Sequence, residues 1–115
     1  MTIKAGRYLA LLDASKVERW RHAKGEPDGI DEIVLHAHED GSYTHLLRIR
    51  KGVEIPEPVK HEFHEDAFYI EGEMLNTKTK ELIKGGSYVY HDPREEHGPF
   101  RCVKTCLILE FRYYK

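Results

Sequence analysis

The sequence has little cysteine and no long apolar segment. Two cysteines occur among 115 residues, and no second cysteine pair exists that would complete a structural zinc site. No stretch reaches the roughly 20 apolar residues that a membrane-spanning helix needs. No secretory signal follows the first methionine, so we expect a cytoplasmic protein that does not act at a membrane.

An excess of charge of one sign is also missing. Lysine and arginine number 18 against 20 aspartates and glutamates, a formal net charge of −2 without long runs of either sign. The electrostatic footprint of a nucleic-acid-binding protein is therefore absent, and a nucleic-acid partner is not expected. With 40% hydrophobic and 33% charged residues, a chain of this length predicts one globular domain.

The two cysteines, Cys102 and Cys106, lie in a segment that reads as strand, turn and strand. A tight turn at residues 103–105 would bring the thiols opposite each other, where a disulfide is geometrically feasible. Because the expected compartment is the cytoplasm, we favour reduced thiols in a hairpin.

Most of the chain has a β-strand pattern. Short runs rich in tyrosine, valine and isoleucine carry alternating polar residues, and glycine or proline separates them. The Asp40-Gly41 step predicts a hairpin between residues 33–38 and 43–49. Further strands are expected at residues 67–75, 87–91 and 106–114. Short strands at regular spacing favour an all-β sandwich or barrel.

One segment differs from this pattern. Asp13 can cap a short helix over Ala14–His22, in which Val17 and Trp20 face the sheet. Because this helix spans only about two turns, it forms only if it packs on the rest of the protein. We therefore expect a short helix or an irregular segment here.

Two segments combine histidines with carboxylates. Residues 56–73 contain His61, His64, Glu65 and Asp66 at the start of a predicted strand, and residues 86–100 place His97 after a proline-containing turn. Imidazole and carboxylate ligands together suit Fe²⁺, Zn²⁺, Mn²⁺ or Ni²⁺. Two histidines and one carboxylate leave open positions on the metal for substrate and dioxygen.

The run GVEIPEPVKHEFHEDAFYIEGEM, followed about ten residues later by GGSYVYHDPREEHGPF, resembles the paired motifs of the cupin superfamily. The chain is most similar to small cupins grouped with ChrR-type anti-sigma factors and with acetylacetone- and dihydroxyacetophenone-cleaving dioxygenases. The resemblance covers about residues 30–112 and implies a single-domain jelly-roll β-barrel holding one divalent metal ion. It divides the chain into an N-terminal extension over residues 1–29 and a cupin domain over residues 30–115.

The resemblance implies His61, Asp66 and His97 as metal ligands, while Val59 stands where the family usually has its first histidine. Period-two alternation favours Asp66 as the carboxylate, because it shares a strand face with Phe68 and Ile70, which are expected to line the barrel. Glu65 is the alternative carboxylate. His64 or Glu65 would give a fourth contact if the strand start is bulged.

Other histidines have weaker claims to a role. We expect His64, Glu65 or His91 to move protons, although His91 is equally well explained as a residue at the barrel rim. His36, His38 and His45 lie on the predicted hairpin, and His36 and His38 share a strand face. We interpret that pair as surface or rim residues, since no carboxylate lies in register with it.

The resemblance implies an enzyme for a small oxygenated molecule, first of all a non-haem iron dioxygenase of a dicarbonyl or hydroxy-ketone. The alternatives are a redox-neutral metal-dependent lyase, isomerase or cyclase, a metal-binding sensor module, and a cupin that has lost its metal. The expected partner is a small-molecule substrate. Both faces of the closing strand carry apolar side chains, which favours a homodimer.

Overall fold

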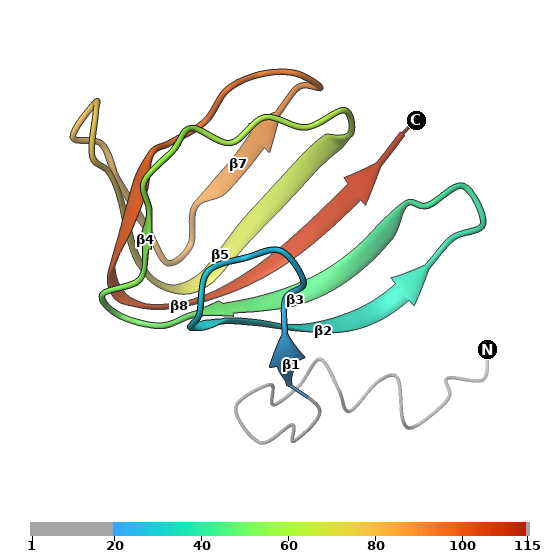
Figure 1. Ribbon diagram of the computed structural model, residues 1–115, viewed down its shortest axis with the longest axis horizontal. Coiled ribbons are helices and arrows are strands. Elements are labelled where there is room, and N and C mark those ends of the chain that lie inside the picture. Colours follow the sequence, from blue (N-terminus) through green and yellow to red (C-terminus); the bar gives the residue numbers. More distant parts are fainter. Residues whose placement is uncertain (1–19, 115) are drawn as a thin grey trace.

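The computed structural model describes residues 20–114, which form β-strands and the loops between them (Figure 1). The strands are β1 (Arg21–His22), β2 (Ile30–Ala37), β3 (Tyr43–Ile49), β4 (Glu54–Ile55), β5 (His64–Asn76), β6 (Leu82–Lys84), β7 (Tyr88–His91) and β8 (Phe100–Tyr113). Every strand pairing is antiparallel. The predicted all-β fold is confirmed. None of the described residues forms a helix long and apolar enough to cross a membrane.

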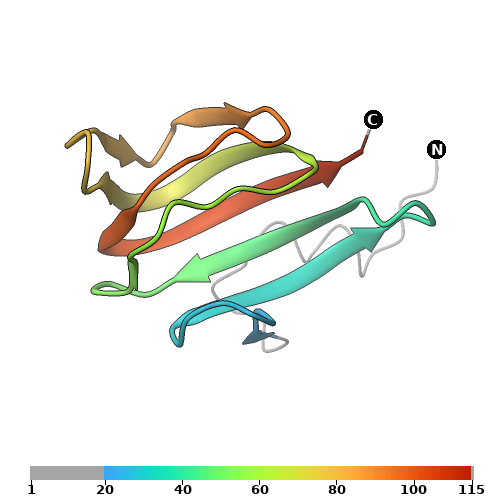
Figure 2. The same ribbon diagram turned by 45° about the horizontal axis from the view of Figure 1, so that its top comes forward.

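The two longest strands, β5 and β8, pair along their length and form the centre of the sheet. Along the main path the strand order is β1-β2-β3-β8-β5-β6, while β4 adds to β8 and β7 adds to β5. Because each central strand changes partner along its length, the sheet curls, as the two views show (Figures 1 and 2). A single bridge between Val59 and His97 joins the two loops that cross the open side.

The predicted hairpin is present as β2 and β3, and its turn follows local side-chain chemistry. Asp40 Oδ1 accepts a hydrogen bond of 2.8 Å from the Ser42 backbone N–H. Gly41 has a φ of +94°, a conformation that favours glycine. The predicted helix over Ala14–His22 lies mostly outside the described residues, but its last two residues form strand β1 instead.

The predicted turn at residues 103–105 is wrong, because β8 runs unbroken from Phe100 to Tyr113. Register shifts between Glu71 and Met74 of β5 place extra residues in β8, while the shift between Tyr69 and Glu71 places one in β5. The buried Sγ atoms of Cys102 and Cys106 consequently lie 3.8 Å apart on one strand, and both thiols are free.

The concave face of the sheet carries the core. Its buried cluster contains side chains from all the long strands, among them Leu47, Ala67, Tyr69, Met74 and Ile108. On β5 the inward residues are odd-numbered at the strand start, so Glu65, Ala67 and Tyr69 are buried while Phe68 and Ile70 are exposed. This parity determines which side chains reach the interior.

Candidate metal centre

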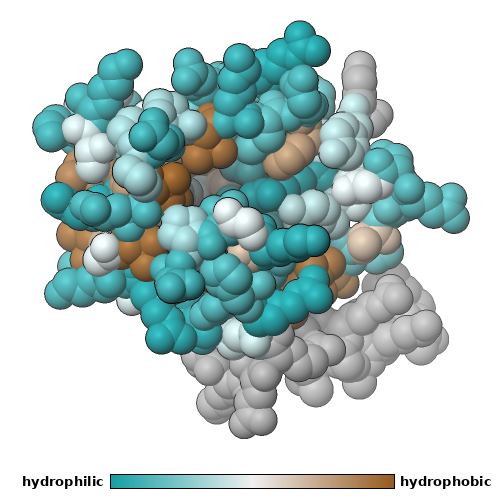
Figure 3. Space-filling view, viewed as in Figure 1, coloured by the Kyte–Doolittle hydropathy of each residue, from teal (hydrophilic) through white to brown (hydrophobic). Residues whose placement is uncertain are grey.

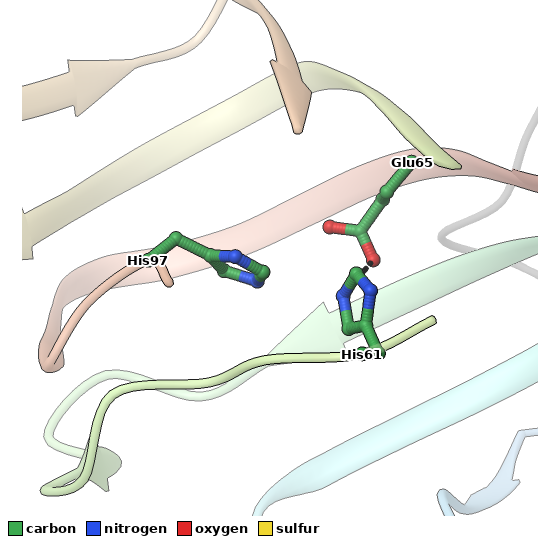
Figure 4. Close-up of side chains that lie close together, drawn as sticks. All are labelled: His61, Glu65 and His97. Atoms are coloured by element: carbon green, nitrogen blue, oxygen red, sulfur yellow. Dashed lines mark ion pairs between the residues drawn. The ribbon is translucent and has the colours of Figure 1, made fainter. Parts of the chain in front are cut away.

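Three side chains from separate segments meet inside the curved sheet (Figure 4). His61 comes from the loop before β5, Glu65 is the second residue of β5, and His97 comes from the loop between β7 and β8. One ligand atom from each residue lies within 4.8 Å of the others. The bridge between Val59 and His97 holds the two histidine-bearing loops together, with backbone N to O distances of 2.8 and 3.0 Å.

The three groups are close enough to share one cation. His61 Nε2 lies 3.3 Å from Glu65 Oε2, and the rings of His61 and His97 have centroids 5.0 Å apart. His61 also stacks on Phe63 at 3.9 Å, which fixes the plane of its ring. Its Nε2 is buried and makes no hydrogen bond of good geometry. A buried polar atom in this state is costly, and a metal ion would satisfy it.

Glu65 is held from behind by the half-buried guanidinium of Arg112. Arg112 Nε lies 3.3 Å from Glu65 Oε2, and its Nη2 lies 3.1 Å from Glu110 Oε1. Arg112 Nη1 donates a 2.9 Å hydrogen bond to the Tyr43 hydroxyl. Since these contacts fix both partners of the ion pair, Arg112 positions the Glu65 carboxylate beneath the histidines.

The ionic contacts continue away from the site. The two ring nitrogens of His45 each lie 2.8 Å from a carboxylate oxygen, one of Glu32 and one of Glu110. Burial alone would raise the pKa of Glu110, but the hydrogen bond with His45 and the charge of Arg112 lower it overall. Carboxylates therefore alternate with an imidazole and a guanidinium from Glu32 to Glu65.

His91 packs beside the three candidate ligands. Its ring stacks on His97 at 3.9 Å, and its Nδ1 lies 2.8 Å from Glu95 Oε2. Burial lowers the pKa of His97, and the neighbouring His91 adds to this shift. Both effects favour the neutral imidazole, the state in which a histidine binds a metal.

Asp66, the carboxylate favoured by strand alternation, does not face the histidines. It accepts a 2.8 Å hydrogen bond from the Tyr88 hydroxyl on the outer side of the sheet. Side chains at the start of β5 alternate between the two faces of the sheet as predicted, but the face that carries Asp66 is the outer one. Phe68 and Ile70 on that face point outward and are 42% and 43% exposed. The structure brings Glu65 to His61 and His97 instead, which corrects that expectation.

His64 also lies on the outer side, where its Nδ1 is 2.8 Å from the Tyr90 hydroxyl and its ring stacks on Tyr113. It therefore does not supply a fourth contact to the three groups. His45 is buried, at 2% exposed, whereas His36 and His38 on the same hairpin are exposed as expected.

Sequence reasoning missed Arg112 and the role of Glu110. Glu110 shares a strand face with Cys106 and Ile108, and this alternation was the one available signal that it points inward. Arg112, two residues further, follows the same face. Nothing in the local sequence indicates that this face reaches Glu65, because that contact depends on the β5–β8 register.

The candidate ligands line a cavity of about 80 Å³, which is otherwise largely apolar and includes Leu47, Val59 and Tyr69. A second cavity of about 530 Å³ adjoins it and shares His91, His97 and two apolar residues with it. Hydrophobic side chains gather on the left of Figure 3, at the end of the fold where β4 lies. A small ligand would therefore find water-poor surroundings at the three groups.

The donor set fits a divalent metal ion. Two imidazoles and one carboxylate are ligands of iron, zinc, manganese and nickel, and three protein ligands leave positions open for substrate. The residues that would hold the ion are His61, Glu65 and His97.

Comparison with known proteins agrees with this architecture. The family described as "ChrR Cupin-like domain" matches residues 10–113. No curated protein matches the sequence.

Solved structures share the fold at low identity. The polyketide cyclase RemF from Streptomyces resistomycificus is 20% identical, with a TM-score of 0.70, and the match covers 100% of this chain and 81% of that chain. An acetylacetone dioxygenase from Acinetobacter johnsonii is 15% identical, with a TM-score of 0.67, and the match covers 85% of this chain and 71% of that chain. The matched chain in the complex of Rhodobacter sphaeroides SigE with the anti-sigma ChrR is 19% identical, with a TM-score of 0.67. The match covers 96% of this chain and 61% of that chain. With its fold and almost its whole length matched, the chain belongs to the ChrR cupin-like family.

Proposed function

We propose that this protein is a metal-dependent enzyme for a small oxygenated organic molecule, specifically a non-haem iron dioxygenase of a dicarbonyl or hydroxy-ketone. The observation that carries the proposal is the convergence of two imidazoles and one carboxylate within 4.8 Å in a largely apolar cavity. This ligand set, with positions left open, is typical of non-haem iron(II) oxygenases. Bound there, iron(II) would supply Lewis-acid and redox chemistry toward a chelating substrate and dioxygen.

The chain's own residues would prepare the site for this chemistry. Arg112 holds the Glu65 carboxylate, and the stacking of Phe63 on His61 holds that imidazole. Val59 and Tyr69 line the cavity and limit its water content. Groups fixed in this way need little rearrangement during a reaction.

His91 would move the substrate proton. Its Nδ1 is engaged by Glu95 at 2.8 Å, and the residue lines both cavities. A carboxylate on one ring nitrogen orients the imidazole, so the other nitrogen can accept a proton next to a substrate carbonyl. Glu65 would serve as a ligand in this scheme, and His64 would have no part in proton transfer.

Oxygen uptake tests the proposal. The iron-loaded protein is incubated with a panel of small dicarbonyls and hydroxy-ketones, including acetylacetone, and dioxygen consumption is recorded. We expect uptake with at least one compound and a loss of at least about 100-fold in His97→Ala, because removal of a ligand disables the site. The exposed His38→Ala is the matched control and should keep full activity. Equal rates in the two variants would contradict the assignment.

A redox-neutral cyclase, isomerase or lyase is the second candidate. The His91–Glu95 pair favours it, because an oriented base beside a Lewis-acid site can abstract a proton without dioxygen. Turnover that continues under strictly anaerobic conditions would select this activity over the dioxygenase.

A further inference from the structure

Tyr69 brings a phenol into the cavity of the candidate metal centre. It lies on β5 four residues after Glu65, on the same inward face, and lines the cavity together with the three candidate ligands. Its side chain is largely buried, at 8% exposed. Glu65 points from the start of β5 toward the two histidines (Figure 4). Because four residues of a strand span about 13 Å, Tyr69 stands further along the cavity than the carboxylate.

The other polar side chains of this cavity already have partners or a role. Three are the candidate ligands, and Arg112 forms an ion pair with Glu110 at 3.1 Å. His91 Nδ1 lies 2.8 Å from Glu95 Oε2. Within residues 20–114, by contrast, the Tyr69 hydroxyl makes no hydrogen bond. A polar group at such a buried position normally has a partner, so this hydroxyl is available to a ligand.

Backbone contacts on both sides fix the position of the ring. The Tyr69 N–H donates a 2.9 Å hydrogen bond to the Ser87 carbonyl, and the Tyr69 carbonyl accepts one of 2.6 Å from the Gly86 N–H. On its other side Tyr69 pairs with Ile108 of β8. The phenol is therefore positioned before a ligand arrives, which reduces the entropic cost of binding one.

The phenol is a hydrogen-bond donor in this setting. Burial raises the pKa of Tyr69 well above its ordinary value, and the negative charges of Glu110 and Glu65 add to the increase. The group consequently keeps its proton at neutral pH. A protonated phenol enclosed by apolar walls offers that proton to an acceptor such as a carbonyl or hydroxyl oxygen.

The size of the cavity limits the molecule that can occupy it. One water molecule needs about 10–15 Å³, so a cavity of about 80 Å³ has the space of about five to eight waters. A compound with a similar number of heavy atoms would fill the space between the metal and the phenol. Since Leu47, Ile49 and Met74 make the walls apolar, the few polar groups decide how that compound is oriented.

We propose that Tyr69 is a substrate-binding residue, whose hydroxyl donates a hydrogen bond to a substrate oxygen that the metal does not hold. This inference rests on the proposed function and narrows its substrate class. The substrate is a small hydroxy-ketone or dicarbonyl with one oxygen more than the pair that chelates the metal. A compound without that oxygen leaves the phenol unsatisfied in an apolar cavity, and the site therefore selects against it.

Hydroxyacetone and 1,3-dihydroxyacetone provide the test, because they differ by one hydroxyl group. Both offer a carbonyl and a neighbouring hydroxyl to a metal, but only dihydroxyacetone has a third oxygen. NMR titration of the zinc-loaded full chain measures both dissociation constants without dioxygen chemistry. We expect the wild type to bind dihydroxyacetone at least about fivefold more tightly, the effect of one hydrogen bond, and Tyr69→Phe to lose this preference.

Tyr88→Phe is the matched control. It also removes one phenolic hydroxyl, but this hydroxyl bonds Asp66 on the outer side of the sheet, so the wild-type preference should remain. Metal content is measured for each protein, and we expect no change in either variant, because neither tyrosine is among the candidate ligands.

Thermal unfolding of the metal-free protein shows whether the Tyr69 hydroxyl is structural. Tyr69→Phe should melt at the wild-type temperature, because no hydrogen bond within the described chain is lost. A fall of about 4 °C or more would reveal a structural hydrogen bond and overturn the proposal.

Three binding results would also overturn it: equal affinities in the wild type, a preference that persists in Tyr69→Phe, or no binding of either compound. The oxygen-uptake panel tests the proposed function separately. Turnover in that panel together with any of these results would remove the role of Tyr69 and leave the enzyme assignment in place.

Discussion

Val59 lies beside the candidate ligands but offers them no donor atom. It lines the same cavity as His61, two residues away, and its backbone is bonded to that of His97. A side chain at this position therefore faces the three groups from a loop that is already fixed. The native valine leaves the site with three protein ligands.

Val59→His is expected to add a fourth ligand. A third imidazole in the cavity should tighten zinc binding by at least about tenfold, a typical size for changes around a metal. Competition with a chromophoric chelator measures the affinity. Val59→Leu keeps the position apolar and should bind zinc like the wild type; an equal affinity in Val59→His would show that this side chain does not reach the metal.

At the residue scale, the sequence predicted which two histidines meet but not which carboxylate lies beside them. His61 and His97 lie in the two motifs that resemble those of cupins, a resemblance that implies that they meet, and the structure brings them together. Glu65 and Asp66 are adjacent, so choosing between them requires knowing which strand face is buried. Phe68 and Ile70 indicated the wrong face, because their apolar surface belongs to the outer side.

The pairing of β5 with β8 depends on one close approach between backbones. Gly72 has a φ of +108°, and a Cβ at this position would lie 2.5 Å from the Cys106 Cα. Any side chain would push the two central strands apart where the β8 bulge crosses β5. The strands that carry Glu65 and Arg112 are thus held together at a glycine.

Gly72→Ala should destabilise the protein by about 2–4 kcal/mol, since it combines an unfavourable backbone conformation with a clash against backbone atoms. Gly52→Ala is the matched control, because Gly52 has a φ of +91° but no atom within 4 Å of the added Cβ. It should cost only about 1–2 kcal/mol. Urea denaturation gives both values, and equal losses would rule out the close approach as a constraint.

At the element scale, strands bounded by local turn chemistry were predictable. The β2–β3 hairpin is one example, because Asp40 and Gly41 specify its turn. The continuity of β8 was not predictable, because its bulges break the period of two between Cys102 and Cys106 and imitate a turn. A bulge is stabilised by its partner strand, which local sequence does not reveal.

At the scale of the whole molecule, the order of the two motifs predicted the fold. The sequence did not predict the buried contacts between carboxylates, imidazole and guanidinium. Glu32, His45, Glu65, Glu110 and Arg112 come from four strands, and their carboxylates alternate with the imidazole and the guanidinium across the interior. No spacing rule relates them, because they meet only through the sheet register. The structure nevertheless places this alternating set directly behind the candidate metal centre.

Metal content per chain is the most direct test of the central claim that His61, Glu65 and His97 hold one divalent ion. The full chain is purified without a histidine tag, reconstituted with iron(II) or zinc, and analysed for metal beside Glu65→Gln and Asp66→Asn. We predict about one ion per chain in the wild type and in Asp66→Asn, and a large loss in Glu65→Gln with thermal stability of the metal-free protein retained. Loss of metal in Asp66→Asn with retention in Glu65→Gln, or no metal in any of the three proteins, would contradict the account.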